Sequence, residues 1–105
     1  MVIRGLVYRI DVGTANRGHE QRGRRYGVVL SRTDWNMVTV VPTSTSAGAS
    51  QFRPEVEVDG VPTRLLVDQI CSIDVDYMTG EPTGCLSLEE MARLDVTIGR
   101  YLGLN

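Results

Sequence analysis

The stretch Arg17-Gly-His-Glu-Gln-Arg-Gly-Arg-Arg-Tyr-Gly-Val-Val-Leu-Ser31 joins a glycine-punctuated cationic segment to an apolar run. Its first nine residues hold four arginines, one histidine and one glutamate. The apolar run, residues 26–31, predicts a buried strand. Folds often present their working groups on loops that a rigid strand holds in position. We therefore expect this loop to carry the functional groups and the rest of the chain to form the scaffold that holds it.

The segments on either side of this stretch also have strand patterns. Residues 5–12 alternate between apolar and polar positions, with Arg9 and Asp11 on the polar face, which predicts a half-buried strand. Residues 37–43 predict a third strand. We expect it to end or to reach a sheet edge at Pro42, because proline cannot donate a ladder hydrogen bond. The Ser/Thr/Gly/Ala segment that follows, 44–50, predicts a surface loop.

The second half of the chain continues with a hairpin and closes with a helix. Asp59-Gly60, between two alternating segments, is typical of a two-residue hairpin turn. Residues 63–77 predict one or two further strands, and the Gly/Pro-rich residues 78–84 predict a break in regular structure. Residues 87–90, Ser-Leu-Glu-Glu, form a capping box that predicts the start of a helix. Apolar residues follow at helical spacing: Leu88, Met91, Leu94, Ile98 and Leu102. Gly103 stands where the helix is expected to end.

This order of elements predicts one α+β domain, mainly β, spanning residues 1–105: a small antiparallel barrel with a C-terminal helix. A chain of 105 residues can bury a core without disulfides or metals. It has no long apolar run and no signal-peptide pattern, so we expect a cytoplasmic protein with no membrane partner. The two cysteines, Cys71 and Cys85, are expected to be reduced, packed thiols.

Charge is unevenly distributed along the chain. Residues 1–53 carry eight arginines and three acids, and residues 54–105 carry three arginines and ten acids, which together give the net charge of −2. Arginine forks bind phosphate bidentately. The clustered cations therefore favour an anion site in the first half.

Most familiar catalytic motifs are missing. One histidine and two scattered cysteines do not make a metal site, and no phosphate-binding glycine motif or GxSxG serine motif occurs. An anion site of arginine, histidine and hydroxyls remains. In it Arg25 either grips phosphate or is an ordinary surface arginine, and His19 either transfers a proton or is a hydrogen-bonded loop residue. The strand-end hydroxyls of Thr43 and Ser44 could reach the same site.

Together these segments resemble the MazF/PemK (Kid-like) family of toxin endoribonucleases, over nearly the whole chain. Four segments carry the resemblance: Arg4-Gly-Leu-Val-Tyr-Arg-Ile-Asp11, Gly18-His-Glu-Gln-Arg-Gly-Arg-Arg25 with Val28-Val-Leu-Ser31, Val40-Val-Pro-Thr-Ser44, and Asp68-Gln-Ile-Cys-Ser-Ile-Asp74. The resemblance implies an SH3-like (CcdB/Kid/MazF) barrel that works as a homodimer. It also implies metal-independent, cofactor-free cleavage of single-stranded RNA, and a cognate MazE-like antitoxin.

The resemblance also implies roles for individual residues. The family's catalytic arginine falls on Arg25 and its catalytic hydroxyl on Thr43. His19 is our own candidate for the acid or base. The residues that we expect to bind RNA are Arg17, Glu20, Gln21, Arg22, Arg24, Ser44 and Gln69. We expect cleavage to leave a 2′,3′-cyclic phosphate and a 5′-hydroxyl.

Two positions depart from the family pattern. Tyr26 stands where the family usually has proline, and Cys71 stands where it usually has arginine. The second change removes a cation, which bears on sequence preference and on dimer contacts. A CcdB-like gyrase poison, or a non-catalytic relative that binds RNA or antitoxin, is the alternative on the same fold.

Overall fold

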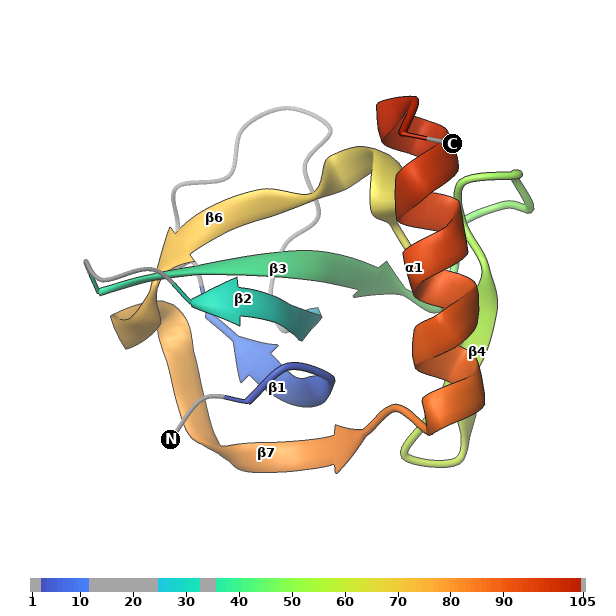
Figure 1. Cartoon of the computed structure of the whole chain (residues 1–105). Helices are drawn as coiled ribbons and strands as arrows, with labels where there is room; N and C mark the ends of the chain where they lie inside the picture. Colours follow the sequence, from blue (N-terminus) through green and yellow to red (C-terminus); the bar gives the residue numbers. More distant parts are fainter. Residues whose placement is uncertain (1–2, 12–24, 33–35, 105) are drawn as a thin grey trace.

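The computed structural model describes residues 3–11, 25–32 and 36–104 of the chain. These residues form a curled antiparallel half-barrel with one C-terminal helix, as the sequence predicts (Figure 1). The strands are β1 (Leu6–Ile10), β2 (Arg25–Arg32), β3 (Met37–Ser44), β4 (Glu55–Val58), β5 (Val61–Leu65), β6 (Cys71–Asp74) and β7 (Met78–Cys85). Two 3₁₀ turns, η1 (Val67–Gln69) and η2 (Val75–Tyr77), flank β6, and the helix is α1 (Leu88–Leu102).

The sheet forks at β3. Its strand order is β4-β5-β3-β2-β1-β7, and β6 also pairs with β3. On one side, the first half of β3 pairs with β6 up to Val40, and its end pairs with β5 from Thr43. Pro42 lies in the gap between these two partners, where no ladder hydrogen bond is needed. The strand therefore reaches a local edge at Pro42, as one of the two expectations had it, but it does not end there, because β3 continues to Ser44.

A second expectation also needs correction. The Gly/Pro-rich residues that were expected to break regular structure form most of β7, which pairs with β1 at the sheet edge. Gly80 has a φ of +68°, a conformation that glycine adopts without strain. Proline is tolerated on an edge strand because its outer side has no partner. Tertiary pairing therefore overrides the local breakers here.

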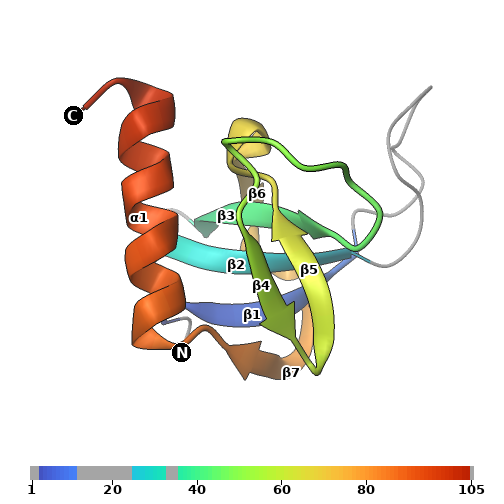
Figure 2. The ribbon, with the colours of Figure 1, turned by 90° about the vertical axis from the view of Figure 1, so that its right-hand side faces the viewer.

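Two hydrophobic clusters lie on opposite faces of the central strands. The first contains Val28 and Val41 of the sheet, residues of the β4–β5 hairpin and Leu94 of α1. The second contains Tyr8, Val29, Val38 and their neighbours, with Ile73 of β6 and Met78 of β7 packed against it. Val7 belongs to the first cluster, so β1 is buried on both faces rather than half-buried. In Figure 2 the hairpin crosses in front of β1, β2 and β3, with α1 beside it.

The hairpin turn and the two ends of the helix form where the sequence predicts them. Asp59 and Gly60 adopt the left-handed backbone that a tight hairpin turn requires, with φ of 52° and 79°. The Ser87 hydroxyl accepts from the Glu90 amide at 3.1 Å, and the Glu90 carboxylate accepts from the Ser87 amide at 2.9 Å. The helix stops at Gly103, which has a φ of 73°.

Candidate functional site

Arg25 is the first residue of β2 and lies opposite Ile10 of β1. Its Nε is buried and has no hydrogen-bond partner among the residues that the structure describes. A buried donor left unpaired costs about 1–3 kcal/mol, more when the group is charged. Such groups in a native fold often mark a ligand or a functional strain.

Arg25 also lines a small hollow at one end of the second cluster. This hollow has a volume of about 70 Å³. Most of its wall is aliphatic and comes from four strands. Besides Arg25 it is lined by Ile10, Tyr26, Val40, Pro42, Cys71 and Ile73. We call it the Arg25 hollow.

Thr43, the predicted catalytic hydroxyl, lies on the opposite face of β3. Val41 belongs to the first cluster, and Thr43 follows it by two residues on that face. Its side chain is buried and donates a hydrogen bond to the Tyr26 carbonyl at 3.1 Å. The Thr43 hydroxyl therefore already donates its hydrogen to a backbone carbonyl.

Ser44 lies on the same face as Arg25. Gly27 pairs with Pro42, so continuing the register brings Arg25 opposite Ser44. The Ser44 Oγ accepts hydrogen bonds from the backbone amides of Ser46 and Ala47, at 3.1 and 3.0 Å. The Ser44 Oγ also lies 3.4 Å from the Ser46 Oγ, and either hydroxyl can be the donor. Of the two predicted hydroxyls, Ser44 is thus the one that shares a face with the arginine.

Cys71 joins the site through the fork in the sheet. It begins β6 and pairs with Val40 of β3, which brings it to the Arg25 hollow. Burial raises the pKa of the Cys71 thiol, and the nearby Arg25 charge partly opposes this. Both cysteines are free, as predicted, but both residues are exposed, so the expectation that they would be packed was wrong.

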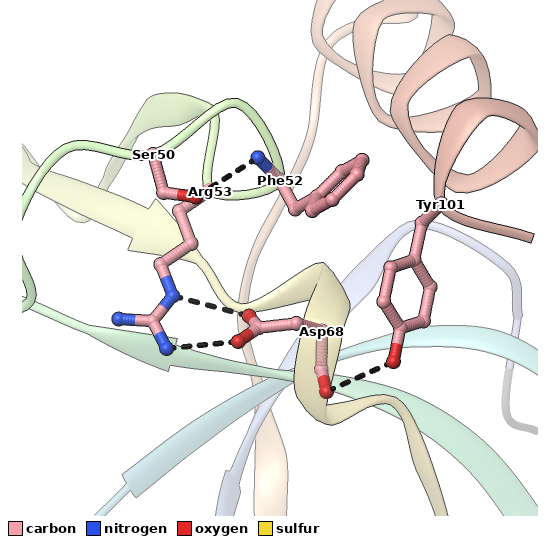
Figure 3. A network of polar contacts seen from close by, with 5 residues as sticks. All are labelled: Ser50, Phe52, Arg53, Asp68 and Tyr101. Carbon is pink, nitrogen blue, oxygen red and sulfur yellow. Dashed lines mark hydrogen bonds and ion pairs between the residues drawn. The ribbon is translucent and has the colours of Figure 1, made fainter.

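An ion pair holds the segment that leads into β6. Arg53 donates to both carboxylate oxygens of Asp68, at 3.1 and 2.9 Å, and lowers the pKa of Asp68 by these hydrogen bonds (Figure 3). Tyr101 of α1 reaches the Asp68 carbonyl at 3.4 Å and packs edge-on against Phe52. This network anchors η1, whose last residue is the predicted RNA-binding residue Gln69, exposed on the surface.

The remaining predicted residues lie outside the described part of the chain. These are His19, the candidate acid or base, and the candidate RNA-binding residues Arg17, Glu20, Gln21, Arg22 and Arg24. Within residues 3–11, 25–32 and 36–104, no three potential metal ligands gather into a site. No helix in that part of the chain is long and apolar enough to cross a membrane.

Sequence reasoning missed the Arg25 hollow and the role of the strand register. Alternation along β3 could have shown that Thr43 and Ser44 face opposite ways. Which of the two hydroxyls shares a face with Arg25 depends on how β2 pairs with β3. No local sequence signal predicts that pairing. The contact between Cys71 and the hollow depends in turn on β6 pairing with β3.

The chain matches the model of one protein family over residues 3–102, described as PemK-like, MazF-like toxin of type II toxin-antitoxin system. It is 58% identical to a candidate toxin of Mycobacterium tuberculosis (strain ATCC 25618 / H37Rv), over 99% of this chain and 100% of that protein.

Solved structures have the same fold. A mycobacterial endoribonuclease in complex with its cognate antitoxin has a TM-score of 0.78 at 19% identity, covering 98% of this chain and 96% of that one. MazF from Deinococcus radiodurans has a TM-score of 0.76 at 26% identity, covering 95% and 94%.

Proposed function

The chain belongs to the PemK-like, MazF-like toxins of type II toxin–antitoxin systems, and on this premise we propose that it is an endoribonuclease that cuts single-stranded RNA. The observation that carries the proposal is Arg25, whose buried Nε has no partner among the described residues and which lies opposite Ser44 on the same face of the sheet. An arginine and a hydroxyl at neighbouring strand positions can hold one phosphodiester between them.

The proposed reaction is an internal transesterification. The RNA 2′-oxygen loses its proton and forms a bond to the adjacent phosphorus. The bond from phosphorus to the 5′-oxygen breaks, and that oxygen takes up a proton. The products are a 2′,3′-cyclic phosphate and a 5′-hydroxyl.

Arg25 stabilises the negative charge that develops on the phosphorane oxygens. A guanidinium offers donors only and does not readily give up a proton near neutral pH, so Arg25 acts as a charge and a donor fork. We assign the neighbouring hydroxyl role to Ser44 rather than to Thr43, because the Thr43 hydroxyl donates to the backbone on the other face. His19 is the proposed acid or base.

A cleavage assay tests the proposal. Purified protein is incubated with a long, unstructured RNA in excess EDTA, and the fragment ends are sequenced. We expect discrete cuts that leave 5′-hydroxyl ends, and their loss in Arg25→Ala. Arg32→Ala is the matched control, because Arg32 is an exposed arginine at the other end of the same strand.

Cleavage by folded Arg25→Ala at the wild-type rate would refute the role of Arg25. Absence of cleavage of any RNA by the folded wild-type protein would instead favour a gyrase poison or a purely binding relative. Truncating residues 98–105 would then separate these two, because a gyrase poison would depend on the helix end.

Two partners complete the proposal. We infer that a MazE-type antitoxin binds and inhibits the protein, as an antitoxin accompanies the similar mycobacterial endoribonuclease. We also infer a homodimer in the cytoplasm. Light scattering should then give twice the chain mass of 11.6 kDa, and a monomer at micromolar concentration would contradict the dimer.

A further inference from the structure

The turn η1 ends at Gln69 but cannot hold its own shape. It is a 3₁₀ helix of three residues, Val67–Gln69, and Leu66 at its start provides no side-chain cap. So short a helix gains too little from its own hydrogen bonds to be ordered in isolation. The shape of η1 therefore depends on contacts with other parts of the fold.

Several of these contacts come from the turn that ends at Arg53. The Arg53 guanidinium donates through Nε and Nη2 to the two carboxylate oxygens of Asp68 (Figure 3). The Val67 amide donates to the Phe52 carbonyl at 3.1 Å. The turn itself is closed by Ser50, whose carbonyl accepts from the Arg53 amide at 3.0 Å and whose hydroxyl accepts from the Phe52 amide at 3.2 Å.

The same turn follows the loop that leaves Ser44 at the end of β3. The ion pair between Arg53 and Asp68 therefore ties this loop to η1. In turn η1 leads into β6, where Cys71 lines the Arg25 hollow. Two chain segments that border the proposed RNA site are thus joined by this ion pair.

The ion pair is better suited to setting geometry than to adding stability. The Arg53 and Asp68 side chains keep 26% and 33% of their surface exposed, and solvent screening limits what such a pair adds to the free energy of unfolding. A bidentate pair nevertheless fixes the plane and the direction of the carboxylate. The Tyr101 hydroxyl donates to the Asp68 carbonyl at 3.4 Å and so restrains the backbone of the same residue.

Gln69 directly follows this restrained residue. It is exposed, and its side-chain amide makes no hydrogen bond to any other residue in the described ranges. An amide group offers both donors and an acceptor, which suit the edges of unpaired RNA bases. The direction in which Gln69 presents these groups depends on the backbone of η1.

We propose that Asp68 is a positioning residue of the RNA site, fixing η1 so that the Gln69 amide meets the bound RNA in one orientation. This inference rests on the proposed function and adds to it a residue that acts through its neighbour rather than by touching the RNA.

The effect should appear in the affinity for RNA and not in the chemical step. A group that is already oriented loses less freedom when it binds. Arg25 and Ser44, which we propose act on the phosphate that is cut, are held by β2 and β3 rather than by η1. Loosening η1 should therefore weaken binding and leave the rate at saturation nearly unchanged.

Asp68 carries a charge whose removal separates two explanations. Arg53 lowers the pKa of Asp68, so the carboxylate is ionised at neutral pH. Asp68→Asn removes this negative charge and releases the Arg53 guanidinium from its ion pair. Electrostatics alone would then tighten the binding of RNA, which is a polyanion. Loss of positioning would weaken it, so the two explanations predict opposite signs.

The experiment uses the full chain and the cut site found in the cleavage assay. The probe is a fluorescent oligonucleotide of that site with a 2′-deoxyribose at the cut, so that it lacks the attacking hydroxyl. Fluorescence anisotropy gives its Kd, and single-turnover cleavage of the matching RNA gives the rate at saturating enzyme. We expect Asp68→Asn to raise Kd at least about fivefold, the effect of losing roughly one hydrogen bond, with the rate within about threefold of the wild type.

Asp95→Asn is the matched control. It makes the same change in charge and breaks the ion pair of Asp95 with Arg4, which joins α1 to the segment before β1. Its Kd should stay within about twofold of the wild type. Arg53→Lys keeps the charge but loses the bidentate geometry, so its Kd should rise about threefold or more. Melting curves identify the folded variants, and Arg53→Lys decides the question if Asp68→Asn does not fold.

A double variant tests whether Asp68 acts through Gln69. If it does, Gln69→Ala should weaken binding by itself, and the addition of Asp68→Asn should change Kd by less than about twofold more. Effects that multiply in the double variant would mean that the two residues act independently, and would overturn the proposal.

Other results would also overturn it. Folded Asp68→Asn that binds the probe as tightly as the wild type, or more tightly, would show that η1 needs no such restraint. A slower rate with an unchanged Kd would place the effect in the chemical step. In both cases cleavage by the wild type would leave the proposed function intact. If the wild type cuts no RNA, the proposed function fails, and this inference with it.

Discussion

Replacing Thr43 by valine and Ser44 by alanine separates the two hydroxyls at the end of β3. The side chains are adjacent in sequence and equally buried, each with 5% of its surface exposed. Burial therefore cannot explain a difference between the two variants. We expect Thr43→Val to alter stability but not catalysis, and Ser44→Ala to alter catalysis strongly.

The magnitude for Thr43 follows from its single hydrogen bond. Thr43→Val keeps the shape of the side chain and removes the bond to the Tyr26 carbonyl, a net loss of about 0.5–1.5 kcal/mol. Valine gains some free energy from the apolar neighbours Val41 and Leu65. The variant should therefore stay folded and cut RNA within about threefold of the wild-type rate.

Ser44→Ala leaves two backbone amides without their acceptor. The loss resembles that of a helix N-cap, about 0.5–2 kcal/mol of stability. If the hydroxyl also helps to hold the charged phosphate, its removal should lower kcat about 10²-fold or more, by analogy with removal of an oxyanion donor. Ser44→Thr keeps the hydroxyl and should restore much of the rate.

The assay is single-turnover cleavage of a fluorescent RNA at saturating enzyme, with a melting curve of each variant. Rates are compared only among variants that remain folded at the assay temperature. A 10²-fold loss in folded Thr43→Val, with Ser44→Ala near the wild-type rate, would refute the assignment. The hydroxyl role would then return to Thr43, as the sequence resemblance implies.

Three further predictions concern stability. Leu94→Ala, at a fully buried position of α1, should lower the free energy of unfolding by about 2–5 kcal/mol in urea melts, and a loss below 1 kcal/mol would mean that the helix packs loosely. Gly27→Ala should cost about 1–3 kcal/mol, because a Cβ there would overlap with Cδ1 of Ile10; a melting temperature equal to the wild type would contradict this packing. Arg53 lowers the folded-state pKa of Asp68, so the stabilisation from this carboxylate is present above its unfolded pKa of about 3.9 and is lost as pH falls through the folded value. The stability gap between wild type and Asp68→Asn should thus shrink in melts below about pH 4, and a gap that is constant from pH 7 to pH 3 would argue against the ion pair.

Several elements could be predicted because their causes lie within a few residues. The Asp59-Gly60 turn needs left-handed backbone, which these two residue types tolerate. The helix start needs an acceptor at Ser87 and a carboxylate at Glu90, both present in the sequence. The prediction of a break over residues 78–84 was wrong for the complementary reason, since their strand form depends on pairing with β1.

The sequence alone determined the first three strands, the hairpin turn, the helix with both of its ends, and the cationic segment that ends at Arg25, because propensity, capping and charge are local properties. The tertiary structure decided which hydroxyl shares a face with Arg25 and where Cys71 lies. Both depend on the fork at β3, where β2, β5 and β6 meet one strand in a definite register. A strand exposes alternate residues to opposite faces, so a shift of one residue in that register would have exchanged the roles of Thr43 and Ser44.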